Sequence, residues 1–237
     1  MSAPTLSRRE RLRLQTLDEI KQHALAQVAE GGGAALSLNA IGKAMGMSGP
    51  AIYRYYASRE ELLAALVTDG YGALAAAVVE AAAATSRRAP ARRLTAVAHA
   101  YRAWALANPY RYELLFSIRP EGYRDPGEAI LSLDGAMRVL LELIGQLARD
   151  AAAGGANGRL DEQLAAWARM REQAAGEEAT GSAPSPLVLR LGVLAWTRIH
   201  GIVTLELAGV TADMGLDAGL LIDAEIDAIA AAAGGAA

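Results

Sequence analysis

The stretch LSLNAIGKAMGMSGPAIYRY, residues 36–55, has the pattern of two short helices joined by a tight turn. Its large apolar residues are Ile41, Met45, Met47, Ile52 and Tyr55. Ile41 and Met45 lie four apart on one helical face, and Ile52 and Tyr55 lie three apart on another. Gly46 tolerates the left-handed backbone that ends many helices. The order of elements predicts a helix-turn-helix, whose second helix enters the major groove of DNA.

Residues at the expected helix starts agree with this prediction. Ser37 and Ser48 are good N-caps for the first and second helix, and Pro50 falls in a first turn, where its missing N–H costs nothing. The second helix and its turn then present hydroxyls, backbone N–H groups and a guanidinium, which bind phosphates and base edges. These groups belong to Ser48, Gly49, Tyr53, Arg54 and Tyr55. The alternative is an ordinary helical hairpin with a glycine turn.

The composition limits the class of protein. A chain of 237 residues can bury a sizeable core and suits one or two domains. It contains no cysteine, so disulfides and thiolate metal sites are excluded and a reducing compartment is expected. Residues 1–17 lack the apolar core of a secretory signal, which favours a cytoplasmic location.

Charge is distributed unevenly along the chain. Residues 1–59 hold eight basic and four acidic residues, whereas the remaining 178 hold fifteen basic and twenty-two acidic ones. A basic head on an acidic body is the pattern expected of a DNA-contacting module attached to a domain that does not bind DNA.

The most apolar window, residues 187–210, is long enough to suggest a membrane span. It is interrupted by four polar or charged residues, Arg190, Arg198, His200 and Glu206. Charges at the centre of a bilayer are costly, so the window is interpreted as a buried or interface helix and no membrane association is expected.

The spacing of apolar residues predicts an all-α fold of about nine helices. Ser7 with Glu10 and Ser58 with Glu61 form capping-box patterns that open the first and the fourth helix. Residues 1–58 are predicted to be a three-helix DNA-binding domain with its helix-turn-helix at about 36–55. Residues 59–237 are predicted to be a larger helical bundle for ligand binding and dimerisation, with one short helix around 160–173.

The run LSLNAIGKAMGMSGPAIYRYYASREELLAAL, residues 36–66, resembles the N-terminal domain of the TetR family of bacterial transcriptional regulators. Gly42 and Tyr56 depart mildly from the usual alanine and phenylalanine. The segment YRAWALANPYRYELLF, residues 101–116, together with Trp196, His200 and Gly201, resembles the family's C-terminal domain type named for its Trp-His-Gly signature.

The resemblance implies a homodimer, with the last two helices of each subunit forming a four-helix interface, and a small-molecule pocket in the body. It implies phosphate contacts by Ser37, Tyr53, Tyr55 and Arg59, and base contacts by Asn39, Gly49, Pro50 and Arg54. Lys43 and Ser48 complete the candidate DNA-binding set. Tyr53 and Tyr56 could instead pack inside the head, and Asn39 could be an ordinary exposed helix residue.

Candidates for the ligand pocket are aromatic residues and one histidine of the body, because aromatic rings with polar tips often line such sites. They are Tyr71, Tyr101, Trp104, Tyr112, Phe116, Trp196 and His200. The alternative is that the rings only pin neighbouring helices together, and that His200 is a core residue or faces the dimer partner. The candidate dimer interface comprises Trp196, Ile199, Val203, Leu207, Leu221, Ile222 and Ile229.

Other functions find little support in the sequence. The three histidines are dispersed, without carboxylates at ligand spacing, so neither a metal nor another cofactor is expected. No Gly-x-Ser-x-Gly elbow, His-Glu-x-x-His pair or phosphate-binding loop occurs, so the chain is predicted not to be an enzyme. The leading hypothesis is a repressor that binds a double-stranded DNA operator and is released from it by a small apolar molecule. The alternative is a helical ligand-binding or scaffolding dimer whose head no longer distinguishes sequences.

Overall fold

A computed structural model describes residues 7–116, 127–149, 158–175 and 183–234 of the chain. Every regular element in these residues is helical and none is a strand, which confirms the all-α prediction. The same ranges contain eleven α-helices where about nine were expected. The difference arises because the short helix near 160–173 was left out of that count and because a four-residue helix is too short to produce a periodic pattern.

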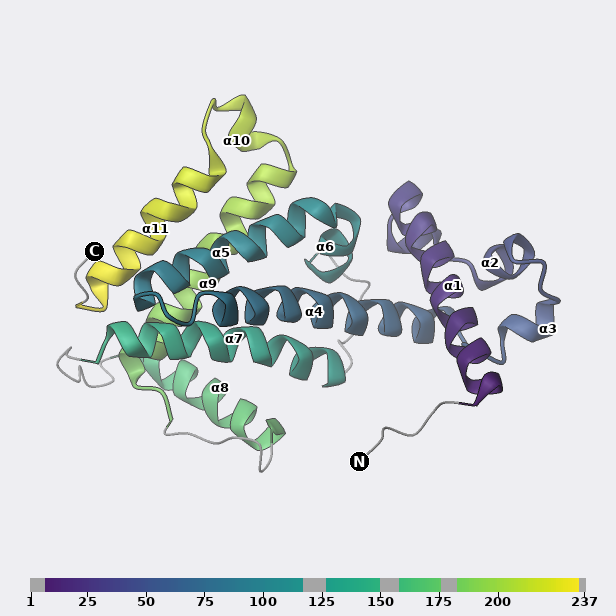
Figure 1. Cartoon of the computed structure of the whole chain (residues 1–237), viewed down its shortest axis with the longest axis horizontal. Coiled ribbons are helices and arrows are strands. Elements are labelled where there is room, and N and C mark those ends of the chain that lie inside the picture. The colour runs from purple at the N-terminus through teal and green to yellow at the C-terminus, as the bar shows by residue number, and fades with distance from the viewer. Residues whose placement is uncertain (1–6, 117–126, 150–157, 176–182, 235–237) are drawn as a thin grey trace. The chain divides into compact units, whose positions relative to one another are not determined.

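Figure 1 shows the helices along the chain. They are α1 (Arg8–Gly31), the 3-10 turn η1 (Gly33–Ala35), α2 (Leu38–Ala44), α3 (Gly49–Ile52), α4 (Arg59–Ala84), α5 (Pro90–Ala107), α6 (Pro109–Phe116), α7 (Gly127–Leu147), α8 (Arg159–Ala175), α9 (Pro186–Leu207), α10 (Val210–Asp213) and α11 (Ala218–Ala232).

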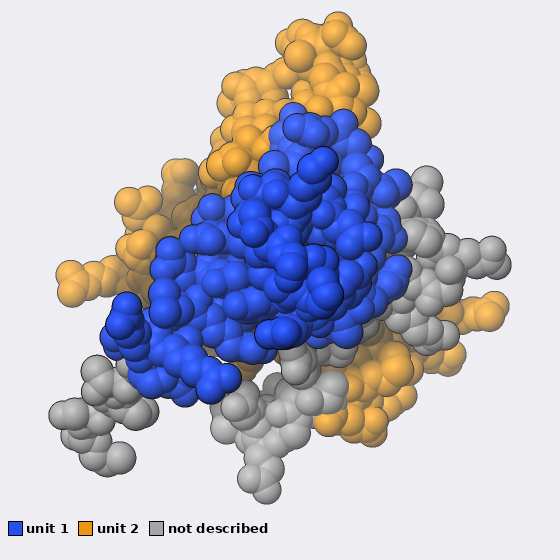
Figure 2. Space-filling model, turned by 90° about the vertical axis from the view of Figure 1, so that its right-hand side faces the viewer, with its two compact units in different colours: residues 1–70, 110–126 blue, residues 71–109, 127–237 orange. Residues whose placement is uncertain are grey.

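The described residues divide into two compact units (Figure 2). The first, called the head below, contains residues 7–70 and 110–116, and the second, called the body, contains residues 71–109, 127–149, 158–175 and 183–234. Helix α4 begins in the head and continues into the body. The domain boundary after residue 58 stays a prediction, and the compact head extends twelve residues further along α4.

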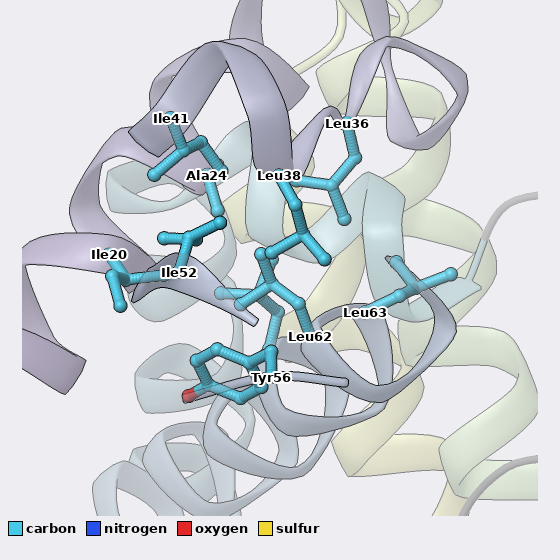
Figure 3. Close-up of a cluster of buried hydrophobic side chains, with 10 residues drawn as sticks. Ile20, Ala24, Leu36, Leu38, Ile41, Ile52, Tyr56, Leu62 and Leu63 are labelled. Carbon is cyan, nitrogen blue, oxygen red and sulfur yellow. The ribbon is translucent and has the colours of Figure 1, made fainter. Parts of the chain in front are cut away.

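The head is built around one apolar cluster to which α1, α2, α3 and α4 all contribute (Figure 3). Helix α1 buries Ile20, Ala24 and Val28, which lie four apart and therefore form a single stripe. Ile20 and Ala24 belong to the cluster, together with Leu36, Leu38, Ile41, Ile52, Tyr56, Leu62, Leu63 and Leu66. Because α4 supplies the last three of these, the helix-turn-helix is held by an element that follows it in the chain.

The predicted cap residues of the head are largely confirmed. Ser7 and Glu10 form a complete capping box, and the Ser37 hydroxyl accepts from the N–H of Ala40 at 3.3 Å. At the start of α4 the Ser58 hydroxyl accepts from the N–H of Glu61, whereas the Glu61 carboxylate reaches the N–H of Ala57 rather than that of Ser58.

Gly46 ends α2 in the left-handed conformation, with φ of 66°. The N–H of Met47 donates to the Gly42 carbonyl and that of Gly46 donates to the Lys43 carbonyl, which is the Schellman pattern. Helix α3 is shorter than expected: it ends at Ile52, and Tyr53 to Tyr55 continue as a turn. The turn bonds reach back only three residues, so the backbone tightens there.

The body is a helical bundle in which α11 packs on α9 and α5, α7 packs on α5 and α9, and α8 packs on α9. Helix α9 buries Ala195, Ile199 and Val203, again four residues apart. Helix α11 faces them with Ile222, Ile226 and Ile229.

Three polar links join α5 to α9 and α11 at the side of this core. Arg102 donates to both carboxylate oxygens of Glu206, at 2.7 and 2.5 Å. His99 Nε2 lies 2.7 Å from Asp223, and the Tyr101 hydroxyl lies 2.9 Å from His200 Nδ1.

Within the described ranges, two helices are long and apolar enough to cross a membrane by length and composition alone, namely α4 and α9. The same test is passed by the core helix of a soluble protein, and the charges of α9 are satisfied by protein partners. Arg190 pairs with Asp161, Arg198 with Glu225 and Glu206 with Arg102. This pairing supports the interpretation of residues 187–210 as a core helix.

Candidate nucleic-acid interface and effector cavity

The candidate DNA-binding residues lie on α2, α3, the flanking turns and the first residue of α4, all within the head. Seven have exposed side chains or backbone: Asn39, Lys43, Ser48, Gly49, Pro50, Tyr53 and Arg54. Ser37, Tyr55 and Arg59 are partly buried. The helix-turn-helix therefore presents an open polar surface with a cationic group on each side of the turn.

Tyr53 and Tyr56, which could either contact DNA or pack inside the head, differ in burial. Tyr56 retains 6 % of its surface and belongs to the core of the head. Tyr53 is 45 % exposed, and its hydroxyl donates to Asn39 Oδ1 at 3.3 Å. This contact joins α2 to the end of α3 and places two candidate DNA-binding groups side by side.

The two serines proposed for DNA contact have different local roles. The Ser37 hydroxyl accepts from the N–H of Ala40, and the backbone N–H of Ser37 donates to Gln27 at 2.8 Å. Ser48 occupies the N-cap position of α3, but its side chain makes no cap hydrogen bond. The predicted N-cap at Ser48 is therefore correct in position and wrong in its hydrogen bond.

Arg59 has a structural role that its sequence context did not reveal. Its Nη2 donates to the carbonyl of Gly33 at 2.6 Å, and its Nε donates to that of Leu36 at 3.1 Å. These bonds tie the first residue of α4 to the segment that leads into α2. A phosphate contact by Arg59 stays a prediction, since much of the guanidinium is already engaged in the fold.

Helix α1 contributes two contacts that sequence reasoning missed. The guanidinium of Arg13 lies 5.6 Å from the centre of the Tyr55 ring, and Lys21 Nζ lies 2.6 Å from Asp69. Burial opposes the charged form of Lys21, but the hydrogen bond and the charge of Asp69 outweigh it and raise the pKa of Lys21. Burial also raises the pKa of the neighbouring Tyr56 hydroxyl.

The body contains an apolar hollow, open to solvent, in which the centre of a water-sized molecule can occupy about 50 Å³. Its walls come from α4, α5, α7 and α9. They are formed by Leu74, Val78, Leu94, Val97, Ala98, Tyr101, Ala136, Met137, Leu140, Trp196 and Ile199. Aliphatic side chains make up most of this lining, and periodicity could not distinguish them from ordinary core residues.

Three of the seven predicted ligand-binding residues meet at this hollow. Tyr101 and Trp196 line it. His200 lies beside both, with Nδ1 2.9 Å from the Tyr101 hydroxyl and its ring stacked on Trp196 at a centroid distance of 5.8 Å. Burial lowers the pKa of His200 and so favours the neutral imidazole, whose Nδ1 can accept the Tyr101 proton.

The other four predicted residues do not line the hollow. Tyr71 and Trp104 belong to the body but are not part of its walls. Tyr112 and Phe116 belong to the head, where their ring centroids lie 4.8 Å apart and Tyr112 is buried. The alternative interpretation, that such rings pin helices together, fits these two residues.

The candidate dimer interface stays a prediction, and four of its residues have little exposed surface in the protomer. Ile199, Val203, Ile222 and Ile229 are buried within the protomer's own core. These residues lie on the buried faces of α9 and α11, which pack on each other within the protomer. Trp196, Leu207 and Leu221 are partly exposed.

A compact head with an exposed helix-turn-helix, followed by a helical bundle, is the architecture of a helix-turn-helix regulator with a separate helical body. Residues 20–66 match the family model described as bacterial regulatory proteins of the tetR family. Residues 94–229 match the model of the tetracyclin repressor-like C-terminal domain. The chain belongs to the TetR family of bacterial transcriptional regulators, and it is a DNA-binding regulator of transcription.

Individual relatives agree with this assignment. The chain is 33 % identical over 202 residues to the HTH-type transcriptional regulators Rv1816 of Mycobacterium tuberculosis and Mb1846 of Mycobacterium bovis, covering 84 % of both sequences in each case. Among solved structures it is similar to the regulatory protein SCO4313, with 37 % identity, a TM-score of 0.74 and coverage of 94 % of this chain and 98 % of that one. A tetR-family regulator from Rhodococcus RHA1 shares the fold, with 16 % identity, a TM-score of 0.59 and coverage of 93 % and 98 %.

Proposed function

We propose that the protein is a cytoplasmic, homodimeric repressor that leaves its operator when an uncharged apolar molecule enters the hollow of the body. The observation that carries this proposal is the continuity of α4. Its residues Leu62, Leu63 and Leu66 belong to the core of the head, and Leu74 and Val78 of the same helix line the hollow. One unbroken helix thus contributes both to the core that supports the helix-turn-helix and to the lining of the hollow.

The DNA side of the proposal rests on the exposed surface of α2 and α3. Arg54, Asn39, Gly49 and Pro50 are proposed to meet base edges, because their groups lie on or beside the short helix that enters the groove. Ser37, Lys43, Ser48, Tyr53, Tyr55 and Arg59 are proposed to meet phosphates or the sugar backbone. Such contacts fix the register of the protein on DNA, and base contacts determine the preferred sequence.

The effector side rests on the chemistry of the lining. Its walls are aliphatic and aromatic, and the Tyr101 hydroxyl is hydrogen-bonded to His200. A charged molecule would lose its hydration there without an opposite charge to replace it. An uncharged, largely apolar effector is therefore favoured.

Dimerisation is proposed to use the face of α9 and α11 opposite to their buried stripes. On α9 this face includes Thr197, Gly201 and Leu205, and on α11 it includes Leu220, Ala224 and Ala228. Leu205 and Leu220 are 48 % and 67 % exposed in the protomer. Small residues around exposed leucines permit close packing of four helices.

Release by an effector requires two arrangements of the dimer that differ in the spacing of the two heads. Only an effector that binds the non-operator arrangement more tightly can shift the equilibrium away from DNA. Helix α4 is the proposed connection, since a change in the lining at Leu74 or Val78 acts on the helix that also holds the head core together.

The DNA-binding proposal is tested by gel shift with the DNA that flanks the protein's own gene, over a range of salt concentrations. The wild type should bind one fragment far more tightly than unrelated DNA. Arg54→Ala should weaken this binding by about 1–3 kcal/mol and reduce the preference for the cognate sequence. Weak binding of every fragment at every salt concentration would instead support the scaffolding alternative.

The effector proposal is tested with the neutral apolar dye N-phenyl-1-naphthylamine. Its fluorescence should rise on binding to the wild type, and Ala98→Met, which fills the hollow, should abolish the rise. Ala103→Met is the matched control, because Ala103 is exposed on the same helix. Equal dye binding by both variants, with melting temperatures unchanged, would place the site elsewhere.

A further inference from the structure

The first two turns of α1 extend beyond the part of that helix that packs on the head. The buried stripe begins at Ile20, whereas every residue from 8 to 15 is exposed. Eight helical residues span about 12 Å. This projection is rich in arginine, with Arg8, Arg9, Arg11 and Arg13.

A short helical segment whose residues are exposed is marginal in water, so local hydrogen bonds matter for its order. These bonds are those of the capping box: the Glu10 carboxylate accepts from the N–H of Ser7 at 2.8 Å, and the Ser7 hydroxyl accepts from the N–H of Glu10 at 3.2 Å. The same bonds hold the carboxylate of Glu10, the only acid between residues 7 and 17, at the cap. With four arginines against this one carboxylate, the projection has an excess of positive charge.

One contact fixes the projection relative to the helix-turn-helix. Arg13 lies over the ring of Tyr55, in the turn that continues α3. Arg9 precedes Arg13 by one helical turn and shares its face. The arginines thus begin beside the end of α3 and continue away from the packed part of the head.

We infer that this arginine-rich projection of α1 is a second DNA-contact surface, which binds the phosphate backbone next to the groove occupied by α3. The inference rests on the proposed function, because it requires that α3 meets DNA. Clustered guanidinium groups that outnumber the nearby carboxylates bind phosphate oxygens well. Their side chains are flexible, so they do not present donors in the fixed geometry that recognition of a base edge requires. The projection should add affinity and salt dependence without changing the preferred sequence.

The test is the double variant Arg8→Gln/Arg9→Gln, which removes two exposed charges and leaves Arg13 on Tyr55. Operator affinity at about 50 mM salt should fall about tenfold or more. The slope of log K against log salt should become shallower by about 0.9 for each phosphate that the variant no longer neutralises. Affinity for unrelated DNA should fall by the same factor, because phosphate contacts are independent of sequence.

The matched control is Arg87→Gln/Arg88→Gln. This pair also follows a serine and is also exposed, but it belongs to the body. The control should bind like the wild type, and circular dichroism should show equal melting temperatures for all three proteins. Equal salt slopes for Arg8→Gln/Arg9→Gln and the wild type would overturn the inference. Failure of the wild type itself to bind any operator fragment would instead overturn the proposed function.

Discussion

Tyr53 and Arg59 lie six residues apart and were assigned the same phosphate-binding role, yet their surroundings differ. Tyr53 is exposed and bonds to another surface residue, Asn39. Arg59 uses two of its nitrogens to bind backbone carbonyls of the head. A sequence shows the type of group at each position, but the partner that engages it depends on the tertiary structure.

The two residues should therefore respond differently to truncation. Tyr53→Ala should weaken operator binding about tenfold and leave the melting temperature unchanged, since it removes an exposed ring and hydroxyl. Arg59→Ala should lower the free energy of unfolding of the head by about 1–3 kcal/mol, because two carbonyls lose a charged donor. Gel shift and thermal melting on both variants separate the effects, and equal melting temperatures would contradict the role given to Arg59.

His200 should make the body less stable as the pH falls. Burial lowers its pKa in the folded state, so below the ordinary histidine pKa of about 6.5 the unfolded chain binds more protons than the folded one. Stability is retained above that pH and decreases progressively below it, until the folded-state pKa is also passed. Urea unfolding at pH 7.5, 6.5 and 5.5 measures the trend.

His200→Gln keeps an acceptor for the Tyr101 hydroxyl and removes the titrating group, so it should flatten the pH dependence. His23→Gln, on the exposed side of α1, should preserve the wild-type trend. An unchanged slope in His200→Gln would assign the pH response to other residues.

At the scale of elements, the sequence predicted starts and ends better than lengths. Serine, glutamate and glycine signals act over three or four residues, so the caps at Ser7, Ser37 and Gly46 could be identified locally. The end of α3 at Ile52 and the four-residue α10 depend on contacts with other elements. Neither leaves a periodic pattern that a sequence could show.

The two glycines of the helix-turn-helix provide a test at this scale. Gly42 is helical, and an added Cβ would lie 3.4 Å from Ile52, an ordinary contact, so Gly42→Ala should stabilise the head by about 0.5–1 kcal/mol. Gly46 has φ of 66°, so Gly46→Ala should destabilise it by about 1 kcal/mol. Chemical denaturation of both variants checks the opposite signs, and a loss of stability in Gly42→Ala would mean that α2 and α3 are packed more closely than described.

For the whole molecule, the fold class, the family and the presence of a helix-turn-helix could be predicted from the sequence. The hollow could not, because Leu74, Val78 and Met137 have the same spacing whether they fill a core or border a cavity. The outward face of α9 and α11 could not be predicted either, because both helices have apolar residues on all sides. Ile199 and Val203 were therefore assigned to a partner, and the structure buries both within the protomer.

Oligomeric state tests the revised assignment. Leu220→Glu should convert dimers to monomers while preserving the helical signal, because Leu220 is exposed in the protomer and a buried carboxylate at an interface is costly. Sedimentation at micromolar concentration measures the change. Leu160→Glu, the same substitution at an exposed leucine of α8, should stay dimeric, and Val203→Glu should unfold the body. A dimeric Leu220→Glu protein would move the interface to another face.

The continuation of the head core into α4 also limits how such regulators can be recombined. A chimera joined at residue 58 would give a foreign bundle the helix-turn-helix without Leu62, Leu63 and Leu66. It would also lack Leu115 of α6, which lies within 3.0 Å of a Cβ built on Gly70. A functional crossover therefore belongs inside α4, near residue 70, with α6 inherited from the same parent as the head.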